Sequence, residues 1–181
     1  MLTFFELWGL ATIKTAIILA NLGTPDAPNP AAIKRYLAEF LADPRVVNLP
    51  RSVWLPILHG VILKTRPKRL AHNYRMIWGT HDGPIRNITA ALTTRVRRYF
   101  TRKYPERDLH FFSAMTYGNP ALSDVLEMAH SQDCDEYLLI PLYPQYAAAT
   151  TATVCDEVYR TLMKMRWQPS LQIIPHYESE P

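Results

Sequence analysis

The sequence has none of the glycine-rich motifs that cradle nucleotide phosphates. No expected strand is followed by Gly-x-Gly-x-x-Gly, or by Gly-x-x-x-x-Gly-Lys and a hydroxyl residue. The loop at residues 21–25 (NLGTP) has a single glycine and ends in proline, which offers no backbone N–H to an anion. These absences argue against a dinucleotide-binding role.

Motifs for a bound metal or a catalytic nucleophile are also missing. The six histidines form no His-x-x-x-His or His-Glu-x-x-His pattern, and none is paired with a cysteine. No nucleophile elbow or Ser/His/Asp set is present. Cys134 and Cys155 are the only cysteines and form no Cys-x-x-Cys pattern. We therefore expect both to be small buried residues of a protein in a reduced, cytoplasmic setting.

Long apolar runs and a strong net charge are absent as well. Residues 1–13 are apolar over only about ten positions, too few to span a bilayer, and are expected to be a poorly defined extension without signal-peptide features. The net charge of +4 comes chiefly from basic clusters at residues 64–69 and 95–103. The first suits an anionic membrane face or a ligand with carboxylates, whereas the second fits a solvated helix face at least as well. No nucleic-acid-binding signature accompanies them, so nucleic acid is not an expected partner.

Short apolar strands alternate with helical patterns along residues 14–181. The run at 15–22 (TAIILANL) is β-branched and apolar throughout, as in a central parallel strand buried on both faces. Strands separated by helices predict a doubly wound, Rossmann-like parallel α/β sheet of about four strands in one lobe. Ligands of such sheets bind outside the carboxyl ends of the strands. The four expected strands are 15–22, 109–117, 137–143 and 171–176, and the loops expected at the carboxyl ends of the first three are 21–25, 115–120 and 144–150.

Several residues are typical of helix ends. Asn29, followed by proline, predicts an N-cap with proline at the first helical position. Asn87 predicts the cap of a second helix beginning at about residue 88. Residues 51–63 are unusually apolar for a connection, and Pro56 and Gly60 are expected to interrupt them.

Five segments at or near the expected strand ends carry a family resemblance. They occur in the family's order and at similar spacing, which makes the joint match far more specific than any one of them. On these segments the chain resembles the N-terminal half of a ferrochelatase of bacterial type, over residues 14–181. The segments are ANLGTPDAPNP (20–30), FLADPRVV (40–47), RPKRLAHNYRMIW (66–78), MTYGNP (115–120) and PLYPQYAAATTATV (141–154).

The resemblance implies a role in heme biosynthesis, the insertion of ferrous iron into a protoporphyrin or coproporphyrin. By their motif positions, Leu22 matches a residue against the macrocycle, Tyr74 a pocket-lining tyrosine, and Arg66 a basic residue for the porphyrin propionates. Each has a structural alternative: a buried strand residue, a helix-core tyrosine and a solvated cation. The family's catalytic base is a histidine in a later Ser-x-His-Gly segment, which these 181 residues lack. We therefore assign no catalytic and no metal-ligating residue in this chain.

Thr116 and Tyr117 are also expected at the substrate. Many members of the family carry arginine where Thr116 stands, which changes a pocket contact and not the family. Residues 147–149 are alanines where other members have serines or an iron–sulfur cysteine. We therefore expect no iron–sulfur cluster and no permanently bound cofactor, with Fe²⁺ entering as a substrate.

The apolar segment Trp54–Leu63 corresponds to the lip over the porphyrin entrance. Beside the basic cluster at 64–69, it is expected either to contact a membrane peripherally, at its inner face, or to be an ordinary pair of packed helices. Two functions stay open: one lobe of a ferrochelatase that provides the porphyrin-binding wall, and a non-catalytic module that binds porphyrin or heme. A single wall predicts weak binding.

Overall fold

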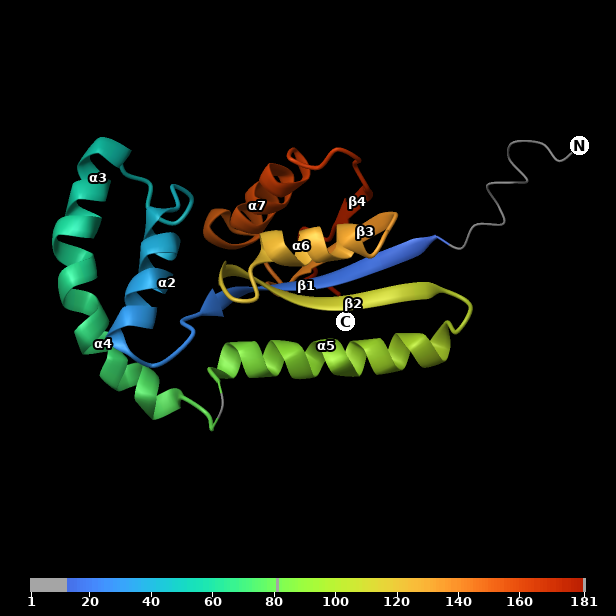
Figure 1. Ribbon diagram of the computed structural model, residues 1–181, viewed down its shortest axis with the longest axis horizontal. Helices are drawn as coiled ribbons and strands as arrows, with labels where there is room; N and C mark the ends of the chain where they lie inside the picture. The colour runs from blue at the N-terminus through green and yellow to red at the C-terminus, as the bar shows by residue number, and fades with distance from the viewer. Residues whose placement is uncertain (1–12, 81, 181) are drawn as a thin grey trace, which may run out of the picture.

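The computed structural model describes residues 13–80 and 82–180, and its centre is a four-stranded parallel sheet. The strands are β1 (Lys14–Thr24), β2 (Asp108–Gly118), β3 (Glu136–Pro141) and β4 (Ser170–Ile173). They lie in the order β2-β1-β3-β4, so the chain winds outward from β1 in both directions (Figure 1). The predicted doubly wound α/β fold with four strands is confirmed.

β1 is the central strand because its side chains are apolar on both faces. Residues 16–20 are all buried, and Ile18 is fully inaccessible to solvent. One face of the sheet packs against α6 (Leu122–Ser131) and α7 (Thr153–Leu162), which follows a π-helical turn, η2 (Ala148–Ala152). The other face, with Ile17 and Phe111 at its centre, is covered by α5 (Pro84–Lys103).

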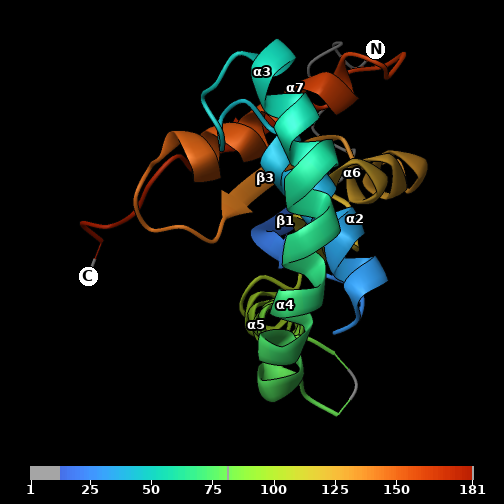
Figure 2. The same cartoon turned by 90° about the vertical axis from the view of Figure 1, so that its left-hand side faces the viewer.

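A group of helices stands at the carboxyl end of the sheet. α2 (Pro30–Ala42) follows β1, and α3 (Arg51–Ile57), η1 (Leu58–Ile62) and α4 (Leu63–Ile77) run on as one rod packed against α2 (Figure 2). Leu58 and Leu63 point into the core that the rod forms with α2. This group places α4 beside the end of β1, where the sequence predicts a ligand.

Of the predicted helix ends and interruptions, one is confirmed and the others are wrong. The Asn29 cap is confirmed, since its Oδ1 accepts from the Ala32 N–H at 2.9 Å. The Asn87 cap is wrong, because α5 begins one turn earlier, with Gly83 as its N-cap and Pro84 in its first turn. Pro56 and Gly60 do not break the rod, which instead passes through a π-helical turn after the proline.

Two further predictions concern the N-terminal residues and membrane-spanning helices. The predicted extension at residues 1–13 lies outside the described residues except for Ile13, which is exposed. Within 13–80 and 82–180, no helix is both long and apolar enough to cross a membrane.

Candidate functional site

The candidate site lies where the winding of the sheet reverses. The connection after β1 leads to β2 on one side, and the connection after β3 leads to β4 on the other. In open parallel sheets, a ligand crevice forms at this switch point, outside the carboxyl ends of the strands. Here the end of β1 meets α2, α4 and the start of α5 (Figure 1).

A cavity of about 310 Å³ occupies this position and brings Leu22 and Tyr74 together. Leu22 comes from the end of β1 and Tyr74 from the last turns of α4, so residues 52 positions apart share one wall. Both side chains are half-buried, and the Tyr74 ring meets Trp78 edge-on at 6.2 Å. The rest of the lining combines aliphatic residues with a few polar ones: Gly23, Thr24, Tyr36, Asn73, Ile77, Pro84 and Ile85.

The orientation of Leu22 is fixed by its neighbour Asn21. The Asn21 Oδ1 accepts from the Leu22 N–H at 2.8 Å, while its Nδ2 donates to the Thr89 Oγ1 at 3.0 Å. Thr89 is fully buried on α5 and donates to the Ile85 carbonyl. β1 and α5 are therefore held together at the cavity by side-chain hydrogen bonds.

Gly23 allows β1 to approach its neighbour β2, an edge strand, closely at this end of the sheet. Its φ of +110° lies in a region that L side chains rarely adopt, and a Cβ there would stand 1.8 Å from the Tyr117 carbonyl oxygen. Only glycine permits this approach of β1 to β2. It follows that the apolar run ends at glycine for reasons of strand packing, not of phosphate binding.

Two tyrosines make the cavity wall neutral and apolar. Burial raises the pKa of the Tyr74 phenol, and burial with neighbouring Tyr74 does the same for Tyr36. The Tyr36 hydroxyl donates to the Gly23 carbonyl at 3.4 Å, a long hydrogen bond. Both phenols are protonated at neutral pH, so the wall suits a flat, apolar ligand better than an anion.

Thr116 and Tyr117 line a second, more polar hollow of about 670 Å³ between α2, the end of β2 and α7, which shares Thr24 and Tyr36 with the first. Thr116 donates to the Asn21 carbonyl at 3.1 Å. Tyr117 is 6% exposed and donates to the Asp43 Oδ2 at 2.8 Å. Burial and this carboxylate raise the pKa of the Tyr117 phenol. Both residues thus tie strand ends together. Neither lines the cavity of Leu22 and Tyr74, although Tyr117 belongs to the hydrophobic cluster against which those two side chains pack.

Arg66 is exposed on α4 and lines neither hollow. Within the described part of the chain, it forms no ion pair. Its helix carries Tyr74 two turns further on, about 12 Å along the axis. The predicted trio is therefore only partly assembled: Leu22 and Tyr74 share a cavity, and Arg66 is exposed to solvent elsewhere on α4.

Sequence reasoning missed Arg86 and Asn21. The Arg86 guanidinium donates twice to the Asp82 carboxylate, at 2.8 and 3.0 Å, and reaches the Thr24 and Pro25 carbonyls at 3.4 Å. It therefore ties the start of α5 to the end of β1. Its signal in the sequence was weak, because one arginine after a Gly-Pro pair has no characteristic spacing.

The described residues hold no group of three or more His, Cys, Asp and Glu side chains that would bind a metal ion. His59 and His176 are both exposed. Cys134 and Cys155 are free thiols, the first buried as expected and the second half-buried. The site as described is a surface for a ligand, without an assembled set of metal-ligating groups.

The fold and the cavity define a Rossmann-like α/β lobe whose switch point offers an apolar, tyrosine-lined wall in place of a phosphate cradle. A family model for ferrochelatases matches residues 14–181. The chain belongs to the ferrochelatase family.

Individual relatives agree with this assignment. The chain is 43% identical over 170 residues to the ferrochelatase of Brucella anthropi and 44% identical over 172 residues to that of Azoarcus sp.. It is 40% identical over 168 residues to ferrochelatase 2 of Shewanella oneidensis. These alignments cover 93–94% of this chain but only 46–51% of each relative. The chain thus spans about half the length of these relatives.

Proposed function

We propose that this chain binds a porphyrin at the carboxyl edge of its sheet and serves as the porphyrin-binding wall for ferrous iron insertion in heme biosynthesis. The observation that carries the proposal is the shared cavity of Leu22 and Tyr74, two residues from separate family motifs. A flat macrocycle would be stabilised by packing against the apolar leucine side chain and against the face or edge of the tyrosine ring. Both phenols at the cavity remain neutral, so they do not repel a dianionic substrate.

Arg66 is proposed to meet a propionate of the bound porphyrin. It stands on the same helix as Tyr74, about 12 Å away along the axis, and its side chain is exposed. A guanidinium binds a carboxylate through two parallel hydrogen bonds, which suits a charge at the edge of an apolar disc. Thr116 and Tyr117 are proposed to act on the substrate only indirectly, by fixing the strand ends.

Iron insertion requires that two pyrrole N–H protons leave the porphyrin, which calls for a base. None of the residues at the cavity is a histidine or a carboxylate. We therefore propose that these 181 residues shape and hold the porphyrin while deprotonation depends on groups that they do not include. Fe²⁺ enters as a substrate, and no iron–sulfur cluster is proposed because residues 147–149 are alanines.

Absorbance titration of the chain with protoporphyrin tests the wall directly. We expect a Soret shift with weak affinity, since one wall covers one face only. Tyr74→Ala should weaken binding by about two- to tenfold through the lost aromatic contact. Tyr159→Ala, at a tyrosine that is 52% exposed on α7, is the matched control and should bind like the parent. No Soret shift, or equal losses in both variants, would contradict the proposal.

A metal-insertion assay separates the two functions left open by the sequence. The proposal predicts binding without robust turnover when the chain is given zinc or ferrous iron with protoporphyrin. Turnover at a ferrochelatase-like rate would show that the needed base is present after all. Binding of heme as tight as that of metal-free porphyrin, without turnover, would favour the non-catalytic module.

The lip segment is proposed to contact a membrane peripherally, from the cytoplasmic side. Only part of it is available, since the Trp54 indole donates to the Leu41 carbonyl at 2.6 Å and Leu58 is buried. Within the segment, Ile57 and Val61 are 41% and 56% exposed, and Val53, one residue before it, is 54% exposed at the same helical spacing. Val61→Glu should reduce co-flotation with liposomes, and unchanged flotation would count against a lip contact.

A further inference from the structure

The outer side of α5 carries a concentration of positive charge that the porphyrin site does not use. Over its 20 residues, α5 has six cations and no acidic residue. Two of the cations make contacts within the fold: Arg86 forms an ion pair with Asp82, and Arg97 donates to the Phe111 carbonyl at 2.7 Å. The others form no ion pair within residues 13–80 and 82–180.

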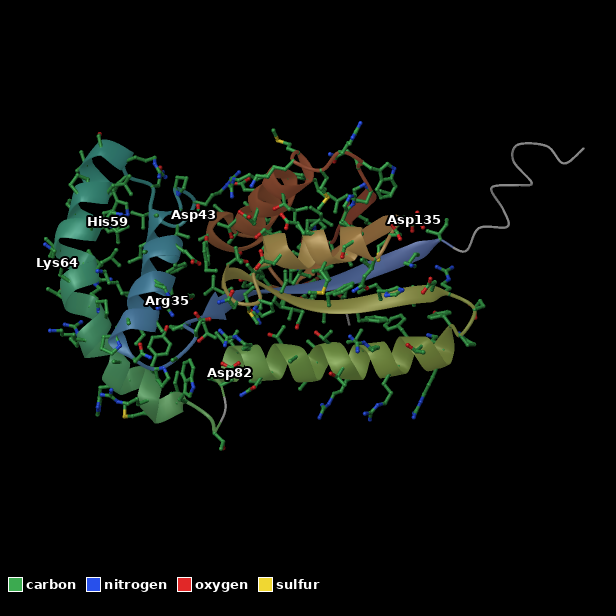
Figure 3. The ribbon with its side chains drawn as sticks, viewed as in Figure 1. Arg35, Asp43, His59, Lys64, Asp82 and Asp135 are labelled. Atoms are coloured by element: carbon green, nitrogen blue, oxygen red, sulfur yellow. The ribbon has the colours of Figure 1, made fainter. Side chains whose placement is uncertain are left out.

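Arg95, Arg98 and Arg102 lie on one side of α5 because they are three and seven positions apart. All three are exposed. The opposite side of the helix is the one that packs on the sheet, through the buried Thr89 and Thr93. In Figure 3, nitrogen-tipped side chains accordingly project from α5 on the side away from the strands. The three guanidinium groups therefore point together into solvent.

An apolar strip runs beside the arginines. Ile88, Leu92 and Tyr99 are 66%, 38% and 55% exposed, and they follow one another at helical spacing. Lys103 lies over the Tyr99 ring at 5.3 Å and donates to its hydroxyl at 3.1 Å. Three exposed apolar side chains in one strip form a patch, which indicates an interaction surface where a single exposed residue would not.

The arginine stems enclose a shallow hollow of about 390 Å³. It is lined by Arg95, Arg98, Tyr99, Arg102 and Lys103 alone. Four cationic side chains thus border one depression with a tyrosine ring at its side. Such a depression can accept a single phosphate group among charge-assisted hydrogen bonds.

We propose that the outer face of α5 binds an anionic phospholipid surface. Its arginines would meet lipid phosphates while Ile88, Leu92 and Tyr99 enter the headgroup region, the division of labour of an interfacial amphipathic helix. Nucleic acid would use the cations but leave the aliphatic strip in water. A second copy of the chain, related by a two-fold axis through this face, would bring arginine against arginine.

Vesicle co-sedimentation of the full chain tests the proposal without reference to porphyrin. The parent is expected to bind vesicles of equimolar phosphatidylcholine and phosphatidylglycerol, not phosphatidylcholine alone, and to dissociate in molar salt. The variant R95Q/R98Q/R102Q should lose roughly a hundredfold in affinity for the mixed vesicles. Ile88→Ser, at a side chain that is 66% exposed, should weaken binding without changing the charge.

The matched control is K64Q/K68Q/R69Q, which removes the same charge from exposed positions on α4. It should cause a much smaller loss than R95Q/R98Q/R102Q, and so should Val61→Glu, which removes only the lip contact. Equal losses in the two triple variants would overturn the proposal in favour of a net-charge effect, and a loss confined to Val61→Glu would assign all membrane contact to the lip. A parent that fails to bind the mixed vesicles, or binds duplex DNA more tightly through the same arginines, also overturns it. The melting temperature of each variant shows that it is folded, and Ile88→Ser decides the matter if the triple variant is not.

Discussion

Tyr117→Phe separates a substrate contact from a structural tie, because it removes one hydroxyl and nothing else. In the structure this hydroxyl donates to the Asp43 Oδ2 at 2.8 Å, and the ring lies edge-on to Phe40 at 5.3 Å. Phenylalanine keeps the ring and its packing. The variant therefore loses the hydrogen bond between the end of β2 and the end of α2.

The expected cost follows from the partner's charge and exposure. A hydrogen bond to a charged group contributes about 1.5–3 kcal/mol. Asp43 is half-exposed and also accepts from the Arg45 N–H at 2.7 Å, so water and a second donor lessen the loss. We expect about 1–2 kcal/mol of destabilisation, and a melting temperature lower by roughly 2–8 °C for a chain of this size.

Thermal unfolding followed by circular dichroism, together with the Soret titration, checks this prediction. Tyr159→Phe is the control, since that tyrosine is 52% exposed and should tolerate the change. The structure predicts lower stability for Tyr117→Phe with porphyrin affinity unchanged. An unchanged melting temperature with a tenfold loss of porphyrin affinity would refute the structural role and show that the Tyr117 hydroxyl contacts the substrate.

Three further variants probe the backbone and the surface charge of the lobe. Gly23→Ala should prevent stable folding, because its Cβ would stand 1.8 Å from the Tyr117 carbonyl oxygen. Gly60→Ala is the control: its new Cβ has no atom within 4 Å, so the change should be neutral or stabilising by up to about 1 kcal/mol. Soluble yield and melting temperature measure both effects, and a well-folded Gly23→Ala would contradict the geometry. The hydrogen bond from Arg45 lowers the pKa of the Asp156 carboxyl, so this pair stabilises the fold above the unfolded-state pKa of about 4 and ceases to do so as the pH falls through the lower folded value. Arg45→Gln should therefore lower the melting temperature by about 1 °C at pH 7 and have no effect near pH 2, and an effect that grows in acid would show the sign to be wrong.

Local patterns predicted those parts of the fold that depend on local chemistry. The apolar run of β1 needed only its composition to indicate a central strand, and Asn29 with its following proline fixed a helix start within four residues of sequence. The prediction of Asn87 as an N-cap was wrong because asparagine is also compatible with the first turn of a helix, here one that Gly83 and Pro84 begin. Pro56 misled because a π-helical turn absorbs the lost hydrogen bond without ending the rod.

The candidate site could be predicted only through the motifs, and only in part. Leu22 and Tyr74 meet because the rod from α3 to α4 returns along α2, and no local pattern states that path. Thr116 and Tyr117 were expected with them, yet β2 lies on the far side of β1 from β3 and directs them to a different hollow. Arg86 and Asn21 support the cavity by hydrogen bonds across more than 60 residues, which spacing within the sequence does not reveal.

α5 joins the two proposed functions, since one end of it belongs to the cavity and the other to the basic face. Pro84 and Ile85 line the cavity, and Thr89 is bonded to Asn21, so the first turns are rigidly attached to β1. The cluster from Arg95 to Lys103 begins about 15 Å further along the axis. A lobe bound to lipid through that cluster would hold α5 parallel to the surface, with its cavity beyond the end of the contact. Membrane binding would then orient the porphyrin wall without covering it, so vesicles should leave the porphyrin affinity of the chain unchanged or raise it.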